Sequence, residues 1–549
     1  MKSCPTCQSV YADEALDFCR GDGALLVSSS PPLAETAAET AATWTFPASR
    51  PSAETHVGAI PGTPSIAVLP FVNMSSDPEN EFFCDGLAEE LINALTKVEQ
   101  MRVVARTSAF SFKGKDAHIS RIGQALSVNT VLEGSVRRVG DRLRITAQLI
   151  DVADGFHLWS ERYDRRLEDV FEIQDDLSLA IVGALRIKLL GEKKAAVLKH
   201  YTADAETYQL YLRGIYHYHR WTEEGYRKAI ECFRQVTENE PNHAPAHARL
   251  AGAYSQQHFF GHAPPREIVS EWRSAALKAL EIDASLAEAH LAVALFKFNY
   301  EWDWAGAEES FRKAIELNPN HAATHEFFPF LLLALGRFEE AVAEGRRACE
   351  LDPRSLVGNL NTGWAYWPTG QYDRLIENGR GLLALDPNFF GGHWQAGVGY
   401  WLQGKYEEAL AEYQRALALS PIPLVRSQLG AIYGLSGRRD MARRVLGELR
   451  ELRERRYVPA FDIALVHAGL GETDEAFAWL GKAYEERNGE LVHLRFFPRP
   501  FSDLAADPRF TQLLRSMRVP TSGAPPHARR QLTANTSLME LESVGGGRT

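Results

Sequence analysis

Three cysteines near the N-terminus have the spacing of a metal site. Cys4 and Cys7 form a Cys-x-x-Cys pair, and Cys19 starts a second short motif in which Asp22 stands where a fourth cysteine would complete the set. Three thiolates and one carboxylate oxygen can hold a zinc ion in tetrahedral geometry. The spacing therefore predicts one structural zinc bound by these four residues. The alternative is a degenerate module that folds weakly without metal.

Charged and nucleophilic side chains also gather between residues 84 and 108. Asp85, Glu89 and Glu90 occupy a predicted helix, where Asp85 is expected to be the N-cap and the two glutamates to form the solvated face. Residues 106–108 follow a predicted strand and are expected to form a turn. Cys84 has no base next to it in the sequence, so a buried thiol is favoured over a nucleophile.

Familiar catalytic signatures are absent from the sequence. It contains no Walker A loop, no H-E-x-x-H, no G-x-S-x-G and no kinase H-R-D or D-F-G motif. We therefore expect a protein that is not an enzyme. A formal net charge of -11 over 549 residues argues against general binding to the phosphate backbone of nucleic acids. It does not exclude a small module that binds nucleic acid locally.

The placement of the cysteines and the hydropathy of the sequence indicate in which cellular compartment the protein is expected. The six cysteines do not resemble a secreted disulfide framework, because three of them crowd into the first 19 residues. The sequence shows neither an apolar stretch of about 18 residues nor the pattern of a signal peptide. These features predict a cytoplasmic location.

The first ordered block covers residues 65–195. It begins with the buried strand SIAVLPF, continues with an amphipathic helix over FFCDGLAEELINALTKV, and includes the hairpin strands VLEGSVRRV and RLRITAQLIDV around Gly140-Asp141. This order predicts a compact α/β domain. Residues 28–64 and 519–549 are rich in small and polar residues without a sustained period, so we expect a disordered linker and a disordered tail.

Periodicity decides the second block, residues 200–518. Pro319, Pro353, Pro387 and Pro421 close successive helical units and stand 34 residues apart. That interval is the tetratricopeptide period. We expect an all-α solenoid of about eight repeats, closed by a C-terminal capping helix that covers the last hydrophobic face.

A solenoid of paired helices exposes a concave groove lined by the first helix of each pair, and such grooves bind peptides or partner helices. Pattern positions explain most of the aromatic residues as core. Trp367 and Trp401 are left as candidate partner-binding residues, because Trp side chains carry much interface energy. The expected partner is a protein or peptide, and neither a membrane nor a nucleic acid is expected.

Several stretches of residues 65–190 carry a family resemblance. SIAVLPFVNMSSDPENEFFCDGLAEELINAL, RVVARTSAFSFKGK and VLEGSVRRVGDRLRITAQLIDVADGFHLWSERYDR resemble the TolB-N-like, or FlgO-like, domain of large bacterial proteins that also carry tetratricopeptide repeats. In that family the domain lies between an effector, such as a nucleotide cyclase, a Ser/Thr kinase or a winged-helix module, and the repeat array. Residues 1–27 resemble a minimal zinc ribbon. The second motif of such a ribbon is usually Cys-x-x-Cys, and this chain departs from it because Asp22 replaces the last cysteine.

Together these features predict a multidomain chain with a zinc-ribbon-like module, a TolB-N-like α/β domain and a tetratricopeptide solenoid. The favoured function is a non-enzymatic scaffold or signalling adaptor whose groove binds a partner. One alternative is a transcriptional or nucleic-acid-linked regulator that acts through the zinc-ribbon-like module. Another is an α/β domain that binds a small ligand or hides an enzymatic activity.

Overall fold

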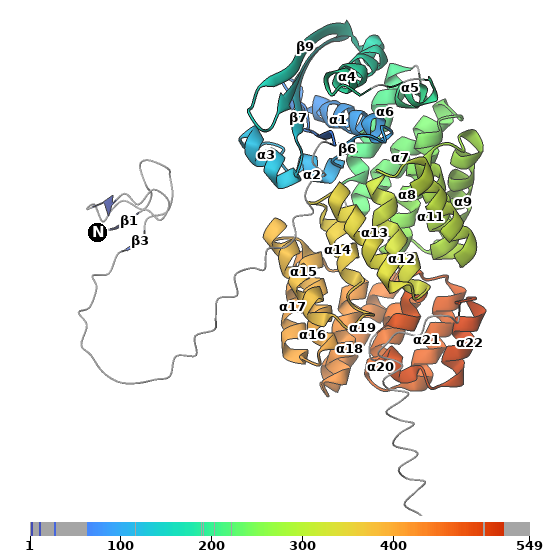
Figure 1. Ribbon diagram of the computed structural model, residues 1–549. Helices are drawn as coiled ribbons and strands as arrows, with labels where there is room; N and C mark the ends of the chain where they lie inside the picture. Colours follow the sequence, from blue (N-terminus) through green and yellow to red (C-terminus); the bar gives the residue numbers. More distant parts are fainter. Residues whose placement is uncertain are drawn as a thin grey trace, which may run out of the picture. The chain divides into compact units, whose positions relative to one another are not determined.

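The computed structural model describes residues 2–3, 10–11, 27–28, 63–115, 117–187, 189, 191–202, 204–220, 222–497 and 500–520. The chain divides into two compact units, residues 1–58 and residues 59–549 (Figure 1). The four predicted zinc ligands Cys4, Cys7, Cys19 and Asp22 lie outside the described residues, as do most of the predicted linker and nearly all of the predicted tail.

The first unit contains a small antiparallel sheet of two-residue strands. These are β1 (Lys2–Ser3), β2 (Val10–Tyr11) and β3 (Val27–Ser28), in the order β2-β1-β3. Lys2 is opposite Tyr11 on one side and Ser28 on the other. The segments between these strands in the sequence hold the predicted zinc ligands, so the zinc site stays a prediction.

The second unit begins with a six-stranded mixed sheet. Its strands are β4 (Ser65–Val68), β5 (Val72–Asn73), β6 (Arg102–Val103), β7 (Thr130–Val139), β8 (Arg142–Asp151) and β9 (His157–Arg166). The order is β6-β4-β7-β8-β9, with β5 pairing against β7. The strand pairs β4–β6 and β4–β7 are parallel, whereas β7, β8 and β9 form an antiparallel meander. The predicted turn at Gly140 has a φ of 62° and joins β7 to β8.

Helices cover both faces of this sheet. They are η1 (Pro78–Asn80), α1 (Glu81–Thr96), α2 (Arg106–Phe110), α3 (Ile119–Leu126), η2 (Leu167–Asp169), α4 (Val170–Ala184) and α5 (Gly191–Val197). The apolar sides of α1 and α4 share one core with Val136 and Ile145 of the sheet. On the other face, Ile122 and Leu126 of α3 pack against Val131.

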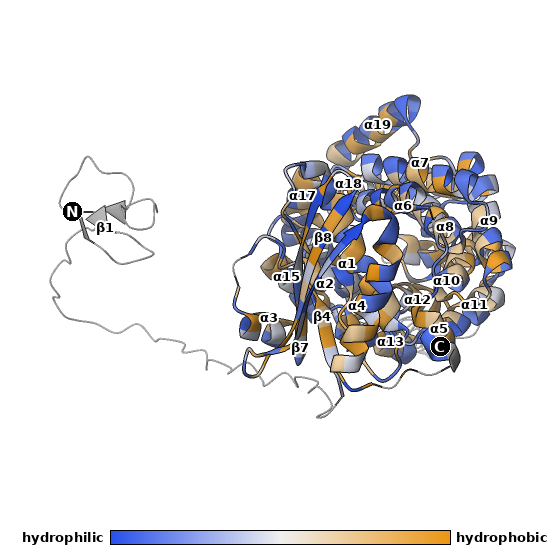
Figure 2. Ribbon diagram, turned by 90° about the horizontal axis from the view of Figure 1, so that it is seen from above, coloured by the Kyte–Doolittle hydropathy of each residue, from blue (hydrophilic) through white to orange (hydrophobic). Residues whose placement is uncertain are grey.

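Paired helices make up the rest of the second unit. They are α6 (Ala205–Tyr218), α7 (Glu223–Asn239), α8 (Ala244–Phe259), α9 (Pro265–Ile282), α10 (Ala287–Phe296), α11 (Trp304–Leu317), α12 (Ala322–Ala334), α13 (Phe338–Leu351), α14 (Leu356–Trp364), α15 (Tyr372–Leu385), α16 (Phe390–Leu402), α17 (Tyr406–Leu419), α18 (Pro423–Leu435), α19 (Arg439–Arg455), α20 (Ala460–Gly469) and α21 (Thr473–Glu485). The described residues thus form eight consecutive helical pairs from α6 to α21. Figure 2 shows the polar and apolar residues that share individual helices such as α7 and α19.

Shorter elements complete the array. They are η3 (Lys297–Glu301), η4 (Gly489–Phe496), η5 (Phe501–Leu504) and α22 (Pro508–Ser516). Phe501 and Phe510 are buried there and extend the core of the last pairs, as a capping segment does.

The array of pairs closes on itself. Trp304 Nε1, at the start of α11, donates a hydrogen bond of 3.0 Å to the carbonyl oxygen of Met517. The Arg487 guanidinium lies 4.0 Å from the ring centroid of Trp302. Arg456 Nη1, after α19, is 3.9 Å from Glu223 Oε2 at the start of α7. The C-terminal part of the array therefore contacts residues that lie more than two hundred positions earlier in the sequence.

Candidate functional site

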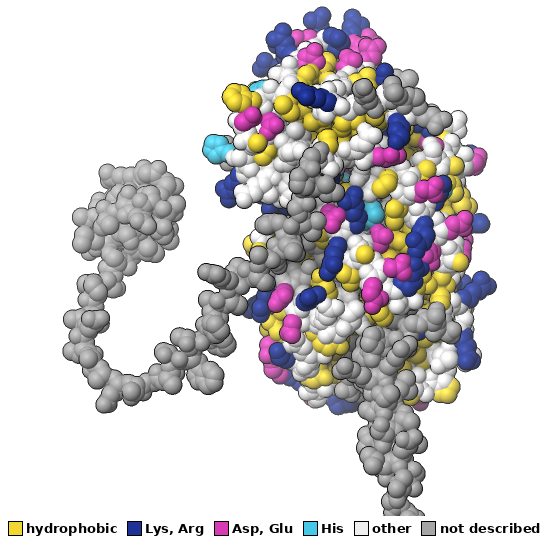
Figure 3. Space-filling model, in the orientation of Figure 1, with side chains coloured by type: hydrophobic (Ala, Val, Ile, Leu, Met, Phe, Trp, Pro, Cys, Tyr) yellow, Lys and Arg dark blue, Asp and Glu magenta, His cyan; other side chains and the backbone are white. Residues whose placement is uncertain are grey.

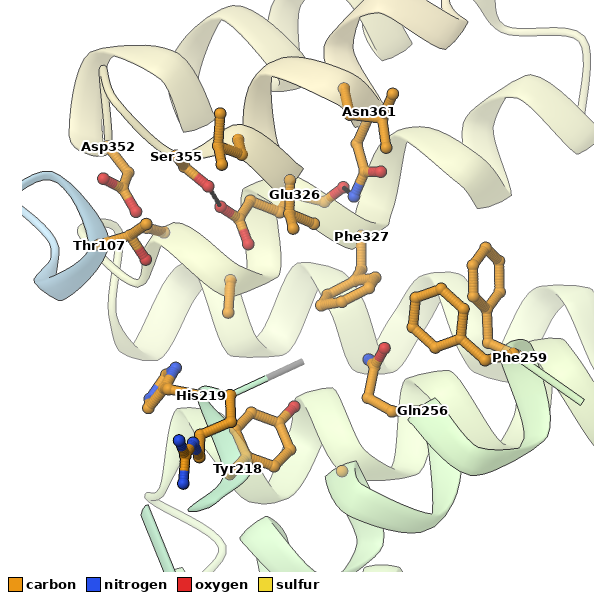
Figure 4. Close-up of a pocket in the computed structure, with 18 of the residues that line it drawn as sticks. Thr107, Tyr218, His219, Gln256, Phe259, Glu326, Phe327, Asp352, Ser355 and Asn361 are labelled. Atoms are coloured by element: carbon orange, nitrogen blue, oxygen red, sulfur yellow. Dashed lines mark hydrogen bonds between the residues drawn. The ribbon is translucent and has the colours of Figure 1, made fainter. Parts of the chain in front are cut away.

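A cavity of about 790 Å³ lies on the inner side of the helical pairs. The first helices of five successive pairs line it, namely α8, α10, α12, α14 and α16. Residues of α1 and α2 from the α/β domain line it too. Figure 4 shows side chains from both parts facing this space, with Thr107 on one side and Tyr218, Gln256 and Phe327 around it.

Most of the cavity wall is apolar. Leu291 and Leu295 lie on α10, Phe327 and Phe330 on α12, and Trp394 on α16. The carboxamide groups of Gln256 and Asn361 interrupt this wall and can both donate and accept hydrogen bonds. An apolar wall with a few polar groups is typical of a site that binds an apolar segment in one orientation.

A buried ion cluster stands at the end of the cavity formed by the α/β domain. The Glu89 side chain on α1 is 3% exposed, and its Oε2 lies 2.8 Å from Arg106 Nε of α2. Its Oε1 lies 3.1 Å from Nε2 of His219, the C-cap of α6, and 3.1 Å from Nη2 of Arg249 on α8. One carboxylate therefore joins the α/β domain to the first two helical pairs.

Opposing effects set the proton affinities in this cluster. Burial alone would raise the pKa of Glu89, but His219, Arg106 and Arg249 together lower it to about 2. Burial lowers the pKa of His219 to about 4. At neutral pH Glu89 is consequently ionised and balanced by the two arginines.

A second contact attaches α2 to the turns between helical pairs. The backbone N–H of Ala105 donates to the Leu351 carbonyl at 2.9 Å, and that of Ser108 donates to Asp352 Oδ1 at 2.8 Å. Arg354 Nε donates to Ser111 Oγ at 2.8 Å. The turn that carries Pro353 thus holds the start and the end of α2.

The pKa values of two carboxyl groups beside this contact are raised. Burial raises the pKa of Asp352 to about 6. Burial, together with the nearby charge of Asp352, raises the pKa of Glu326 to about 8. Ser355 Oγ donates to Glu326 Oε1 at 2.9 Å, and Figure 4 shows both side chains on the cavity wall. The raised pKa favours the protonated form of Glu326, which adds a polar group to the wall.

The structure corrects two expectations for α1. Asp85 is not an N-cap, because it lies inside α1 and its Oδ1 is 2.5 Å from Nζ of Lys113. Glu89 is not on a solvated face, because the first helical pairs bury the side of α1 that the sheet leaves open. Residues 106–108 begin α2 instead of forming a turn. Cys84 is fully buried, as expected, and burial raises the pKa of its thiol to about 12.

The two tryptophans predicted to bind a partner lie outside the set of residues that line the cavity. Trp401 is 4% exposed, and its ring centroid is 6.5 Å from that of Tyr413. Trp367 is half-buried, 5.5 Å from the ring of Phe497. Trp364 and Trp394, which do line the cavity, stack edge to face at 4.9 Å. The partner-binding role of Trp367 and Trp401 stays a prediction.

In the part of the chain that the structure describes, no three His, Cys, Asp or Glu side chains are grouped so that they could hold a metal ion. None of the described helices has the length and the apolar character needed to cross a membrane.

A family model for the tetratricopeptide repeat matches residues 390–422, which span α16 and α17. The chain contains tetratricopeptide repeats. A second model, for the second domain of HilA/YgeH-like transcriptional regulators, matches residues 62–179, and thus most of the α/β domain. The resemblance of this domain to the TolB-N-like family stays a prediction.

One curated relative and several solved structures resemble parts of this tetratricopeptide-repeat chain. A protein of Rhizobium meliloti (strain 1021) named putative adenylate cyclase 3 is 44% identical over 192 residues, which are 35% of this chain and 33% of that protein. The chain thus matches about a third of the length of that relative. Pseudomonas aeruginosa PilF is 22% identical, with a TM-score of 0.30, over 38% of this chain and 91% of that one. The TPR protein YrrB, described as having an unusual peptide-binding site, is 21% identical, with a TM-score of 0.25, over 35% and 94%.

Proposed function

We propose that this chain is a non-enzymatic scaffold or signalling adaptor that holds a peptide segment of a partner protein in its inner cavity. The observation that carries the proposal is the cavity of about 790 Å³ on the inner side of the first helices. Tetratricopeptide repeats use that side to bind extended or helical peptides. The name of the Rhizobium relative supports a role in signalling.

The chemistry of the wall favours a peptide with apolar side chains. Phe327, Phe330 and Trp394 offer aromatic surface that an apolar side chain can cover. The carboxamide of Gln256 and the carboxamide oxygen of Asn361 can pair with the backbone of an extended peptide, whereas Asn361 Nδ2 already donates to the Glu326 carbonyl at 3.3 Å. The α/β domain closes one end of the cavity through Glu89 and Arg106, so the peptide has to end or turn there.

A photoreactive residue at the cavity wall tests this function. With a benzoylphenylalanine in place of Phe327 in the full chain, irradiation in cells is expected to attach a partner protein covalently. The same residue in place of Leu419, which is 42% exposed on α17 and does not line the cavity, is the matched control. Adding Ala323→Trp, which fills the cavity from α12, should abolish the adduct at position 327. Equal adducts at both positions, or an adduct that survives the filled cavity, would contradict the proposal.

A second candidate function is regulation of transcription, favoured by the match of residues 62–179 to a domain of transcriptional regulators. If the chain regulates transcription, the N-terminal segment would contact DNA and would bind one zinc ion through Cys4, Cys7, Cys19 and Asp22. We expect about one zinc per wild-type chain and a clear loss of zinc in Cys4→Ser, measured by elemental analysis of the full chain. DNA retention at low salt that Cys4→Ser removes would favour the regulator, whereas zinc binding without DNA retention would favour the scaffold.

A further inference from the structure

Strand β9 is an open edge of the sheet. The order β6-β4-β7-β8-β9 places it last, and among the described strands only β8 pairs with it. Nine of its ten residues are exposed or half-buried, and Tyr163 is the buried one. A long exposed edge with free backbone groups is a template for another strand.

Hydrogen bonds at the end of β9 show which of its residues direct their backbone N–H and C=O groups toward β8 and which direct them toward the open side. Leu167 N donates to the Asp141 carbonyl at 2.7 Å, toward β8, whereas Arg166 N donates to Asp169 Oδ2 at 3.0 Å and is therefore not bonded to β8. Successive residues of a strand point their N–H and C=O groups to opposite sides. The backbone groups of Ser160, Arg162 and Asp164 consequently face the open side, as those of Arg166 do.

The side chains of β9 form a sequence that complements itself. In an antiparallel pair centred on Tyr163, Arg162 is opposite Asp164 of the second strand, and Glu161 is opposite Arg165. Because the pair has two-fold symmetry, each of these contacts occurs twice. A shift of the register by two residues in one direction would place Arg162 opposite Arg162, and in the other direction Asp164 opposite Asp164. Opposite charges across strands stabilise the pair, and like charges weaken it.

From this geometry we propose that two copies of the chain associate through β9, antiparallel and centred on Tyr163, so that their sheets become one continuous sheet. The backbone groups of Ser160, Arg162 and Asp164 would then pair with the second copy. The Asp164 carbonyl accepts from Arg165 Nη1 at 3.1 Å within one chain, and on association it would exchange this side-chain donor for a backbone N–H. Symmetric pairing of one identical surface is the commonest route to a homodimer.

Charges on an edge strand can also serve to keep other strands away. A row of one sign would repel a second copy, but β9 alternates the two signs: Arg162, Asp164 and Arg166 are each about half exposed or more. Asp164 Oδ1 is 2.6 Å from Arg144 Nε and its Oδ2 is 3.2 Å from Arg162 Nε within one chain. Figure 3 shows cationic and anionic side chains intermixed over the end of the molecule where Figure 1 places β9 and α4. This mixed pattern attracts an identical strand.

Charge exchange tests the proposal on the full chain. Arg162→Asp places two aspartates opposite each other at both symmetric positions, and Asp164→Arg does the same with two arginines. Each single variant is expected to weaken dimerisation at least about tenfold. The double variant Arg162→Asp/Asp164→Arg recreates opposite charges and should return the dimer to within a few-fold of wild type. Sedimentation velocity over a range of protein concentrations gives the dissociation constants.

Two controls make the outcome decisive. Arg444→Asp changes the charge by the same amount on α19 and should leave the dissociation constant unchanged. Circular dichroism confirms that each variant is folded, which is expected because the exchanged side chains are exposed. A wild-type chain that stays monomeric at all concentrations would overturn the proposal. So would a dimer that the single exchanges leave intact, or a double variant that associates no better than the single ones.

Discussion

Glu89→Gln is expected to lower the free energy of unfolding by about 3–5 kcal/mol, because it leaves buried arginines without their counter-charge. The Glu89 carboxylate is 3% exposed and contacts Arg106 and Arg249, which themselves are less than one-fifth exposed. The glutamine side chain has the same shape, so the loss reports the charge instead of the packing. Urea unfolding at neutral pH measures it.

The pH dependence identifies the origin of that loss. The pKa of Glu89 is lowered to about 2 in the folded chain, so its stabilising contribution is complete above the carboxyl's ordinary pKa and disappears as the pH falls toward 2. The difference between wild type and Glu89→Gln should therefore shrink below about pH 4.5. Glu408→Gln, at an exposed position on α17, is the matched control and should change the stability by less than about 0.5 kcal/mol. A Glu89→Gln variant as stable as this control at pH 7 would show that the cluster does not join the two parts.

Two glycine substitutions on neighbouring helices are expected to have opposite signs. Gly469, at the end of α20, lies so close to α18 that an added Cβ would be 2.6 Å from Cα and 2.7 Å from the carbonyl oxygen of Ala431. Backbone atoms cannot move aside as the end of a side chain can, so Gly469→Ala should destabilise the chain by about 1–3 kcal/mol. Gly481 lies inside α21 with nothing within 4 Å of an added Cβ. Gly481→Ala should stabilise it by about 0.5–1 kcal/mol, since alanine favours a helix.

Thermal and urea unfolding of wild type and of the two variants measure whether the two changes in the free energy of unfolding have opposite signs. If Gly469→Ala were as stable as Gly481→Ala, the contact between α18 and α20 would be looser than the structure has it.

The repeat array was predictable because its signal is periodic. Prolines 34 residues apart mark the ends of the second helices, and Gly336, Gly370, Gly404, Gly437 and Gly471 stand between the paired helices with φ of 72–79°. The hairpin of β7 and β8 was predictable for a similar reason, since Gly140 and the alternation of Leu143 and Ile145 are local features. Local patterns of this kind need no knowledge of distant contacts.

The candidate site could not be found in that way, because its residues meet only after the chain has folded. Glu89 and Arg249 are 160 residues apart, and Ser108 and Asp352 are 244 apart. A glutamate on the polar face of an amphipathic helix fits the same periodic pattern whether that face is exposed to solvent or covered by a later domain. The pattern alone therefore could not show that Glu89 is buried. Trp394, by contrast, occupies a repeat position that explains it as core, although its side chain also lines the cavity. A weak signal did exist at Arg106, which begins α2 shortly after the end of strand β6.

The contacts between the two ends of the array change how the repeats should unfold. In an open array each repeat meets only its neighbours, so the terminal repeats fray and unfolding can spread from either end. Here Glu223 of the first pair meets Arg456, and Arg487, which follows the last pair, meets Trp302, so neither terminal pair can leave without breaking a contact to a distant part of the array. Such a chain loses its one-dimensional character, and its repeats are expected to melt together as a single cooperative unit.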